Sequence, residues 1–142
     1  MREAMGTTRR AYAAFSARDL ATVGELIAPD CTWRVGGRSQ LSGVYEGRDQ
    51  VLGFFRRLAE VTDRTFQVTL DDLGELNSGL VVALATISGA RAGLASTCRI
   101  TQLIRINAAG RMQESWWFAE DQHALDELLG DRVIRLPQVS RS

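Results

Sequence analysis

The feature that most constrains the fold is a long hairpin pattern in the last third of the chain. Two extended runs, Leu94–Ile106 and Arg111–Glu120, are rich in β-branched and aromatic residues and carry polar side chains on both faces. The turn between them, Asn107–Gly110, ends in a glycine, which can adopt the positive φ that a tight connection requires. We expect the helices and strands before this hairpin to wrap it. Polar residues on a covered sheet face often mark a site, so we look for the site on the covered face of the hairpin.

Helical periodicity dominates the first half of the chain. Residues 2–17 carry apolar side chains on one face at a period of 3.6, which predicts a helix. Asp19 is a candidate N-cap for a short second helix over Leu20–Ala28, which Pro29 ends. A third helix is predicted over residues 48–61, again with one apolar stripe.

Alternating or continuous apolar runs predict strands around these helices. The strands before the hairpin are predicted at Cys31–Val35, Thr65–Leu70 and Leu80–Ser88. An irregular segment punctuated by glycine covers residues 36–47. After the hairpin, a short helix is predicted from an Asp121 N-cap through Leu129, with Gly130 at its C′ position.

The predicted elements follow the order α-α-β-α-β-β-β-β, with a short C-terminal helix. Helices separated from an antiparallel run of strands indicate an α+β fold. A chain of 142 residues is long enough for one ordinary domain, which we assign to residues 1–130. The tail at 131–142 is expected to be loosely held or draped over a neighbour.

Charge and residue counts exclude several classes of function. The formal net charge is zero, so electrostatics favours neither nucleic acid nor an anionic membrane, and no apolar run is long enough to span one. All 17 basic residues are arginine, which excludes Schiff-base chemistry on a lysine. One histidine and two cysteines make a poor ligand set for zinc, and we expect neither a metal nor an organic cofactor. The widely spaced Cys31 and Cys98, with no signal peptide expected, suggest reduced thiols in a cytoplasmic protein.

Three parts of the chain resemble one family. They are Ala11–Leu20 with Leu26–Trp33, the loop Leu41–Val51, and Asn107–Trp116 followed by Asp121. These parts are similar to SnoaL-like proteins of the nuclear transport factor 2-like, or ketosteroid isomerase-like, superfamily. The resemblance implies a cone-shaped, strongly curved antiparallel sheet wrapped by three helices, with an apolar pocket at its open end. It also implies a homodimer formed through the outer face of the sheet.

The resemblance does not determine a reaction, because this scaffold carries many activities. The steroid isomerase branch uses a tyrosine on the first helix, an aspartate base after the first strand and a protonated aspartate on a late strand. Those positions fall on Ala11, near Val35 and on Gln102 in this chain. Ketosteroid isomerisation by that mechanism is therefore not expected.

Two other branches of the superfamily match in part. The limonene epoxide hydrolase branch pairs an arginine with an aspartate two residues later, but Arg99 is followed there by Thr101, with Glu114 across the hairpin. The polyketide cyclase branch implies an acid–base residue near the end of the last strand, where Asp121 is the closest candidate. An apolar pocket would raise the pKa of this carboxyl towards neutrality, and Asp121 can serve as an N-cap as well. His123 is nearby, but its helical spacing favours a surface position.

Strand parity predicts which side chains face the pocket. Neighbouring residues point to opposite faces, and register with the isomerase branch puts Ser115 and Trp117 inside together with Gln102. Glu114 and Trp116 then face outward, towards a dimer partner or a helix, and a single bulge would reverse this assignment. The candidate catalytic residues are Asp121, Gln102 and Arg99. The candidate substrate-binding residues, whose aromatic members also fit a plain core role, are Tyr12, Phe15, Trp33, Tyr45, Phe55, Ser115 and Trp117.

Two functions from different classes follow from these patterns. The first is a cofactor-independent enzyme acting on a hydrophobic polycyclic or polyketide-like molecule by acid–base chemistry: cyclisation, isomerisation or epoxide opening. The second is a non-catalytic small-molecule-binding or dimerisation module on the same scaffold. A large apolar pocket with one buried carboxylate of raised pKa would favour the enzyme, and an interior filled by the protein's own side chains would favour the module.

Overall fold

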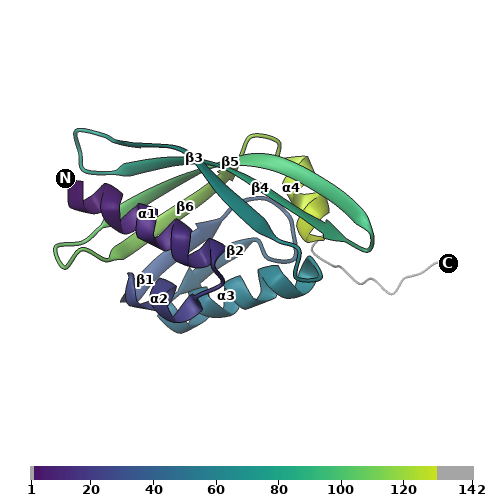
Figure 1. The fold of residues 1–142 in the computed structure, drawn as a ribbon, viewed down its shortest axis with the longest axis horizontal. Coiled ribbons are helices and arrows are strands. Elements are labelled where there is room, and N and C mark those ends of the chain that lie inside the picture. Colours follow the sequence, from purple (N-terminus) through teal and green to yellow (C-terminus); the bar gives the residue numbers. More distant parts are fainter. Residues whose placement is uncertain (1, 131–142) are drawn as a thin grey trace.

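The computed structural model describes residues 2–130, in which four helices pack against one curved, six-stranded sheet (Figure 1). None of these helices is long and apolar enough to cross a membrane. The predicted tail at 131–142 lies outside the described residues. The helices are α1 (Arg2–Ser16), α2 (Leu20–Glu25), α3 (Arg48–Val61) and α4 (Gln122–Leu129). The strands are β1 (Ile27–Val35), β2 (Gly43–Glu46), β3 (Gln67–Glu75), β4 (Val81–Arg91), β5 (Leu94–Ile106) and β6 (Met112–Ala119).

The α+β prediction is confirmed, with one difference in the sheet. The strand order is β2-β1-β6-β5-β4-β3, and neighbouring strands are antiparallel except β1 and β6, which are parallel. A parallel pair needs a long crossover, and the chain between β1 and β6 contains α3 and the other four strands. Local alternation carries no information about such a distant pairing, which is why the sequence predicted an antiparallel sheet throughout.

The junction between α2 and β1 also differs from its prediction. The sequence predicts the second helix through Ala28, but β1 already begins at Ile27. The carbonyl of Leu26 accepts a hydrogen bond from the N–H of Met112 at 2.8 Å, which draws the chain into the sheet beside β6. Pro29 lies where the β1–β6 pairing is interrupted, so its missing N–H removes no ladder hydrogen bond.

The irregular segment before α3 contains a strand that its sequence pattern does not predict. β2 pairs antiparallel with β1, from Thr32 opposite Glu46 to Val35 opposite Gly43. Its side chains are half-buried or exposed and show no apolar alternation. Backbone pairing with β1 therefore forms this strand, and a hydrophobicity pattern could not have revealed it.

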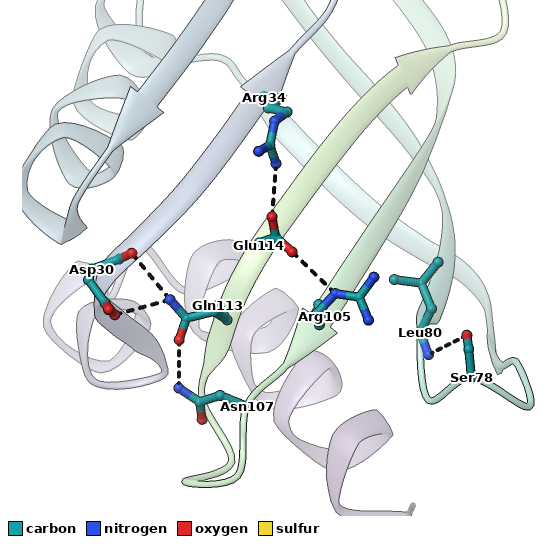
Figure 2. A network of polar contacts seen from close by, with 8 residues as sticks. All are labelled: Asp30, Arg34, Ser78, Leu80, Arg105, Asn107, Gln113 and Glu114. Atoms are coloured by element: carbon teal, nitrogen blue, oxygen red, sulfur yellow. Dashed lines mark hydrogen bonds and ion pairs between the residues drawn. The ribbon is translucent and has the colours of Figure 1, made fainter.

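The long hairpin is confirmed as β5 and β6, and side chains hold its turn. Asn107 Oδ1 accepts the N–H of Arg111 at 3.0 Å, and Gly110 has a φ of 80°. Figure 2 shows Gln113 beside this turn, where it accepts a hydrogen bond from Asn107 Nδ2 (3.0 Å) and donates one to the Asp30 carboxylate (3.0 Å). These bonds tie the hairpin to β1 across the interrupted stretch of parallel pairing.

One face of the sheet is buried and the other is largely open. Along β5, Gln102 and Ile104 are buried, whereas Arg99 and Arg105 are exposed, as a period of two requires. Helices α1 and α3 cover the buried face (Figure 1). The largest fully buried side chain is Phe54 of α3, and the candidate site lies beside the core that it fills.

Candidate functional site

An apolar cavity of about 40 Å³ lies between the buried face of the sheet and helices α1, α2 and α3. Its walls include six residues predicted for the site: Tyr12, Phe15, Trp33, Phe55, Gln102 and Trp117. Six further residues complete the walls: Ala11, Val23, Phe66, Val68, Ile100 and Met112. Strand parity could have identified Ile100, which shares a face with Gln102, but Val23 and Met112 reach the cavity only through packing of distant segments.

A chain of hydrogen bonds between neutral side chains forms the polar end of this cavity. The Tyr12 hydroxyl donates to Gln102 Oε1 at 2.6 Å, and Gln102 Nε2 donates to Ser115 Oγ at 2.7 Å. Gln102 is 3% exposed and Ser115 is completely buried, so both side chains are held away from water. The two bonds set the orientation of the Gln102 amide and leave the tyrosine oxygen at the cavity wall.

Among the described residues, none that lines the cavity carries a charge. Burial raises the pKa of Tyr12 above its ordinary value near 10, so the phenol remains protonated at neutral pH. The other residues that line the cavity are apolar, aromatic or, at Gln102, an amide. Within residues 2–130, no group of three or more His, Cys, Asp or Glu side chains could hold a metal ion. The cavity therefore offers hydrogen bonds and apolar contact in place of an ionised acid or base.

Two indole N–H groups at the cavity lack hydrogen-bond partners. Trp33 Nε1 and Trp117 Nε1 are buried, and neither has a partner among the described residues. Both rings are packed edge-on against α3, Trp33 on Phe55 at 5.6 Å and Trp117 on Phe54 at 5.4 Å between centroids. An unsatisfied buried donor costs about 1–3 kcal/mol. A ligand oxygen that accepted from either indole would remove part of that cost.

The predicted parity of β6 is confirmed. Ser115 and Trp117 are buried on the inner face, whereas Glu114 lies on the outer face between two arginines (Figure 2). Its carboxylate accepts from Arg34 Nη1 at 3.4 Å and from Arg105 Nε at 3.2 Å. The Arg34 guanidinium also lies 5.0 Å from the ring centre of Trp116, which shares the outer face. The bulge near Arg105 lies beyond these residues and does not reverse their orientation.

Two of the three candidate catalytic residues lie outside the cavity. Asp121 is exposed and caps α4, where its carboxylate accepts the N–H of Ala124 at 3.1 Å. Arg99 is exposed on the outer face and pairs with Glu120 at 3.1 Å. The reason is parity, since Arg99 and Gln102 are three residues apart on one strand and must point to opposite faces. Only Gln102 of the predicted catalytic set is in the cavity.

Tyr45 and His123 also lie away from the cavity. The Tyr45 hydroxyl donates to the Leu41 carbonyl at 2.6 Å, and its ring packs on Phe54 at 4.8 Å between centroids. His123 is exposed on α4 and lies 3.3 Å from Glu127, one turn along the helix. Tyr45 therefore packs against the core, and His123 occupies the surface position that its spacing favoured.

Comparison with known proteins shows which family the chain is similar to. Residues 8–115 match the family model described as the SnoaL-like domain. The uncharacterized protein Rv0034 of Mycobacterium tuberculosis is 34% identical over 118 residues, covering 83% of this chain and 89% of the relative. The solved structure of Bal32a, from a soil-derived mobile gene cassette, is 26% identical with a TM-score of 0.86 and covers 90% of this chain and 97% of Bal32a. An NTF2-like protein of unknown function from Burkholderia pseudomallei is 26% identical with a TM-score of 0.80, covering 91% of this chain and 98% of the neighbour.

Proposed function

Because the chain belongs to the SnoaL-like domain family, we propose that its cavity binds a compact hydrophobic molecule through one oxygen atom of that molecule. The observation that carries this proposal is the hydrogen-bonded chain Tyr12–Gln102–Ser115 at the end of an otherwise apolar cavity. Such a combination of apolar walls and a few oriented polar groups is typical of small-molecule sites. A ligand hydroxyl suits this end of the cavity, because it can donate to the Tyr12 oxygen and accept from the indole N–H of Trp33 or Trp117.

Binding is better supported than catalysis by an acid–base pair. General acid–base chemistry needs a group that exchanges a proton near the working pH, and none of the described residues that line the cavity has a carboxylate or an imidazole. Asp121, the candidate acid–base residue, is an exposed helix cap. The interior is also largely filled by the protein's own aromatic side chains, which favours the binding module among the two functions expected from the sequence.

The proposal is tested with a matched pair of probes, 2-naphthol, which carries a hydroxyl group, and naphthalene, which carries no oxygen. A ligand at about 100 times its dissociation constant adds roughly 2.7 kcal/mol to the free energy of unfolding, which raises the melting temperature by several degrees. We expect this shift with 2-naphthol and a smaller one with naphthalene. Anthraquinones, steroids and terpenoid epoxides extend the same screen to larger molecules. The absence of a shift in melting temperature with every probe would contradict the proposal.

Tyr12→Phe is expected to weaken binding of 2-naphthol about tenfold, because the loss of the hydrogen bond from the ligand hydroxyl to the Tyr12 oxygen corresponds to about 1.4 kcal/mol. Its affinity for naphthalene should stay the same. Asp121→Asn is the control, since asparagine also caps a helix and the side chain lies outside the cavity. Equal losses in Tyr12→Phe and Asp121→Asn, measured by titration calorimetry, would remove Tyr12 from the site.

A catalytic role without a protein base is the second candidate. The observation in its favour is the pair of unpartnered indole N–H groups of Trp33 and Trp117, which would stabilise negative charge that develops on a bound carbonyl during isomerisation or cyclisation. In that case Trp117→Phe would lose turnover far more than it loses substrate affinity. A loss of turnover in Asp121→Asn would instead support the acid–base assignment made from the sequence.

We further propose that the chain forms a homodimer through the outer face of its sheet. This face carries Trp116 together with two exposed apolar side chains, Leu84 (43% exposed) and Phe118 (50% exposed). Exposed apolar groups of this size on one face favour a protein interface. Phe118→Arg is therefore expected to shift the protein from dimer to monomer in light scattering coupled to size-exclusion chromatography. A wild-type mass equal to that of one chain would contradict the dimer.

A further inference from the structure

A second and larger hollow opens beside the cavity, next to the C-terminal ends of α1 and α3. Its volume is about 370 Å³, compared with about 40 Å³ for the cavity. In the part of the chain that the structure describes, three arginines line it, Arg18, Arg56 and Arg64, and we call this hollow the arginine basin. Glu60 is the one acidic residue among these described lining residues. The basin therefore has a formal excess of two positive charges in a chain whose net charge is zero.

The positive charge of the arginine basin is not neutralised by neighbouring side chains. Among the described side chains of residues 4–130, no carboxylate forms an ion pair with any of the three guanidinium groups, Glu60 included. Arg18 Nη2 makes only a long hydrogen bond of 3.5 Å to the Phe66 carbonyl. Guanidinium groups bind carboxylates through paired, charge-assisted hydrogen bonds, so these arginines can receive an anionic group.

Two of the arginines occupy backbone positions where glycine is the usual residue. Arg18 follows α1 with a φ of 60°, and Arg64 follows α3 with a φ of 63°. Residues with a Cβ adopt a positive φ at a steric cost in energy, which glycine avoids because it has no Cβ. A cation near a helix C-terminus is itself favourable, which accounts for part of the preference at these two ends. That effect does not reach Arg56, which lies within α3 and faces the same basin.

A thin aromatic wall separates the arginine basin from the cavity. Phe15, Phe55 and Phe66 line both spaces. The Phe15 ring packs edge-on against Phe55 at 5.0 Å and against Phe66 at 5.9 Å between centroids. Movement of the Phe15 side chain would therefore join the two spaces, and a molecule lying across both would have a charged end and an apolar body.

We propose that the natural ligand is an amphipathic aromatic carboxylate whose carboxylate binds in the arginine basin. The apolar body of the ligand passes the Phe15 wall and enters the cavity. An oxygen atom at the far end of that body, separate from the carboxylate, reaches the Tyr12–Gln102 end. This inference rests on the proposed binding function, to which it adds the class of ligand and a second set of contacts.

The test compares 6-hydroxy-2-naphthoate, which carries a carboxylate at one end and a hydroxyl group at the other, with its neutral methyl ester by titration calorimetry in 50 mM and 500 mM NaCl. Exposed ion pairs contribute modestly and are screened by salt, so the anion should bind roughly tenfold more tightly at low salt and lose most of this advantage at high salt. Arg56→Gln and Arg64→Gln should each weaken binding of the anion about threefold or more and leave the ester unchanged. Arg56→Lys, which keeps the charge, should retain most of the affinity for the anion. Arg57→Gln is the control, because Arg57 contacts Gln40 at 3.2 Å and does not line the basin.

The outcomes separate this inference from the function on which it rests. If the ester binds in a Tyr12-dependent manner and the anion binds no more tightly, the arginine basin is not a carboxylate site and the proposed function stands. Equal effects of Arg56→Gln and Arg57→Gln on the anion would also overturn the inference. If neither probe binds, the proposed function fails together with it. The substituted arginines are exposed, and thermal unfolding of each variant verifies that the fold is kept.

Discussion

Replacing Phe54 with alanine is expected to lower the free energy of unfolding by about 3–5 kcal/mol, the usual cost of removing a large side chain from a core. Phe54 is 1% exposed and packs its ring against Tyr45 at 4.8 Å, Phe55 at 5.5 Å and Trp117 at 5.4 Å. The truncation leaves a void that these rings cannot close without leaving their rotamers. Urea denaturation followed by tryptophan fluorescence measures the change, because Trp117 touches the substituted ring.

The control for this prediction is Leu76→Ala in the turn between β3 and β4. Leu76 is 50% exposed, so its truncation should change the free energy of unfolding by no more than about 0.5 kcal/mol. A loss below about 1 kcal/mol in Phe54→Ala would mean that the core around the cavity collapses on truncation. In that case the aromatic residues would not be a rigid frame for Trp117 and the cavity.

Gln102→Glu is expected to make stability strongly dependent on pH. A protonated glutamic acid can accept from Tyr12 and donate to Ser115, as the amide does, so the variant should be close to wild type at pH 4. Burial disfavours the carboxylate and raises the pKa of the new side chain above its unfolded value near 4.3. The extra stability of the protonated form is therefore present below pH 4.3 and is lost as pH rises through the folded pKa. The expected loss relative to wild type by pH 8 is roughly 2–4 kcal/mol.

Urea denaturation at pH 4, 6 and 8, in parallel with wild type, measures this dependence. Gln50→Glu is the control, because Gln50 is exposed and its Oε1 only accepts the N–H of Glu46 at 2.8 Å, which a carboxylate also does. Its stability relative to wild type should barely change with pH. If the stability of Gln102→Glu relative to wild type were equally independent of pH, residue 102 would be in contact with water. The buried hydrogen-bonded chain would then not describe the site.

Sequence patterns correctly predicted the elements that are determined by residues close together in the chain. The hairpin was predicted because a short turn that ends in glycine lies between two runs rich in β-branched and aromatic residues, and the structure contains it as β5 and β6. Parity correctly separated Ser115 from Glu114, since a strand reverses its side chains at every residue. The strand β2 and the parallel pairing of β1 with β6 were missed, because both arise from backbone contacts between segments with no distinctive side-chain pattern.

The sequence by itself determined the α+β architecture, the aromatic lining of the interior and the Asp121 cap, which follow from periodicity and capping chemistry. The inward position of Gln102 followed from strand parity together with the register that the family resemblance implies. Tertiary structure alone decided that Asp121 lies outside the cavity while Tyr12 meets Gln102 at 2.6 Å, a contact between residues 90 positions apart. It also brought Arg18, Arg56 and Arg64 around one hollow. The physical reason is that periodicity reports which face of its own element a side chain occupies. Which faces meet depends on the packing of helices against the curved sheet, and that packing is a property of the whole chain.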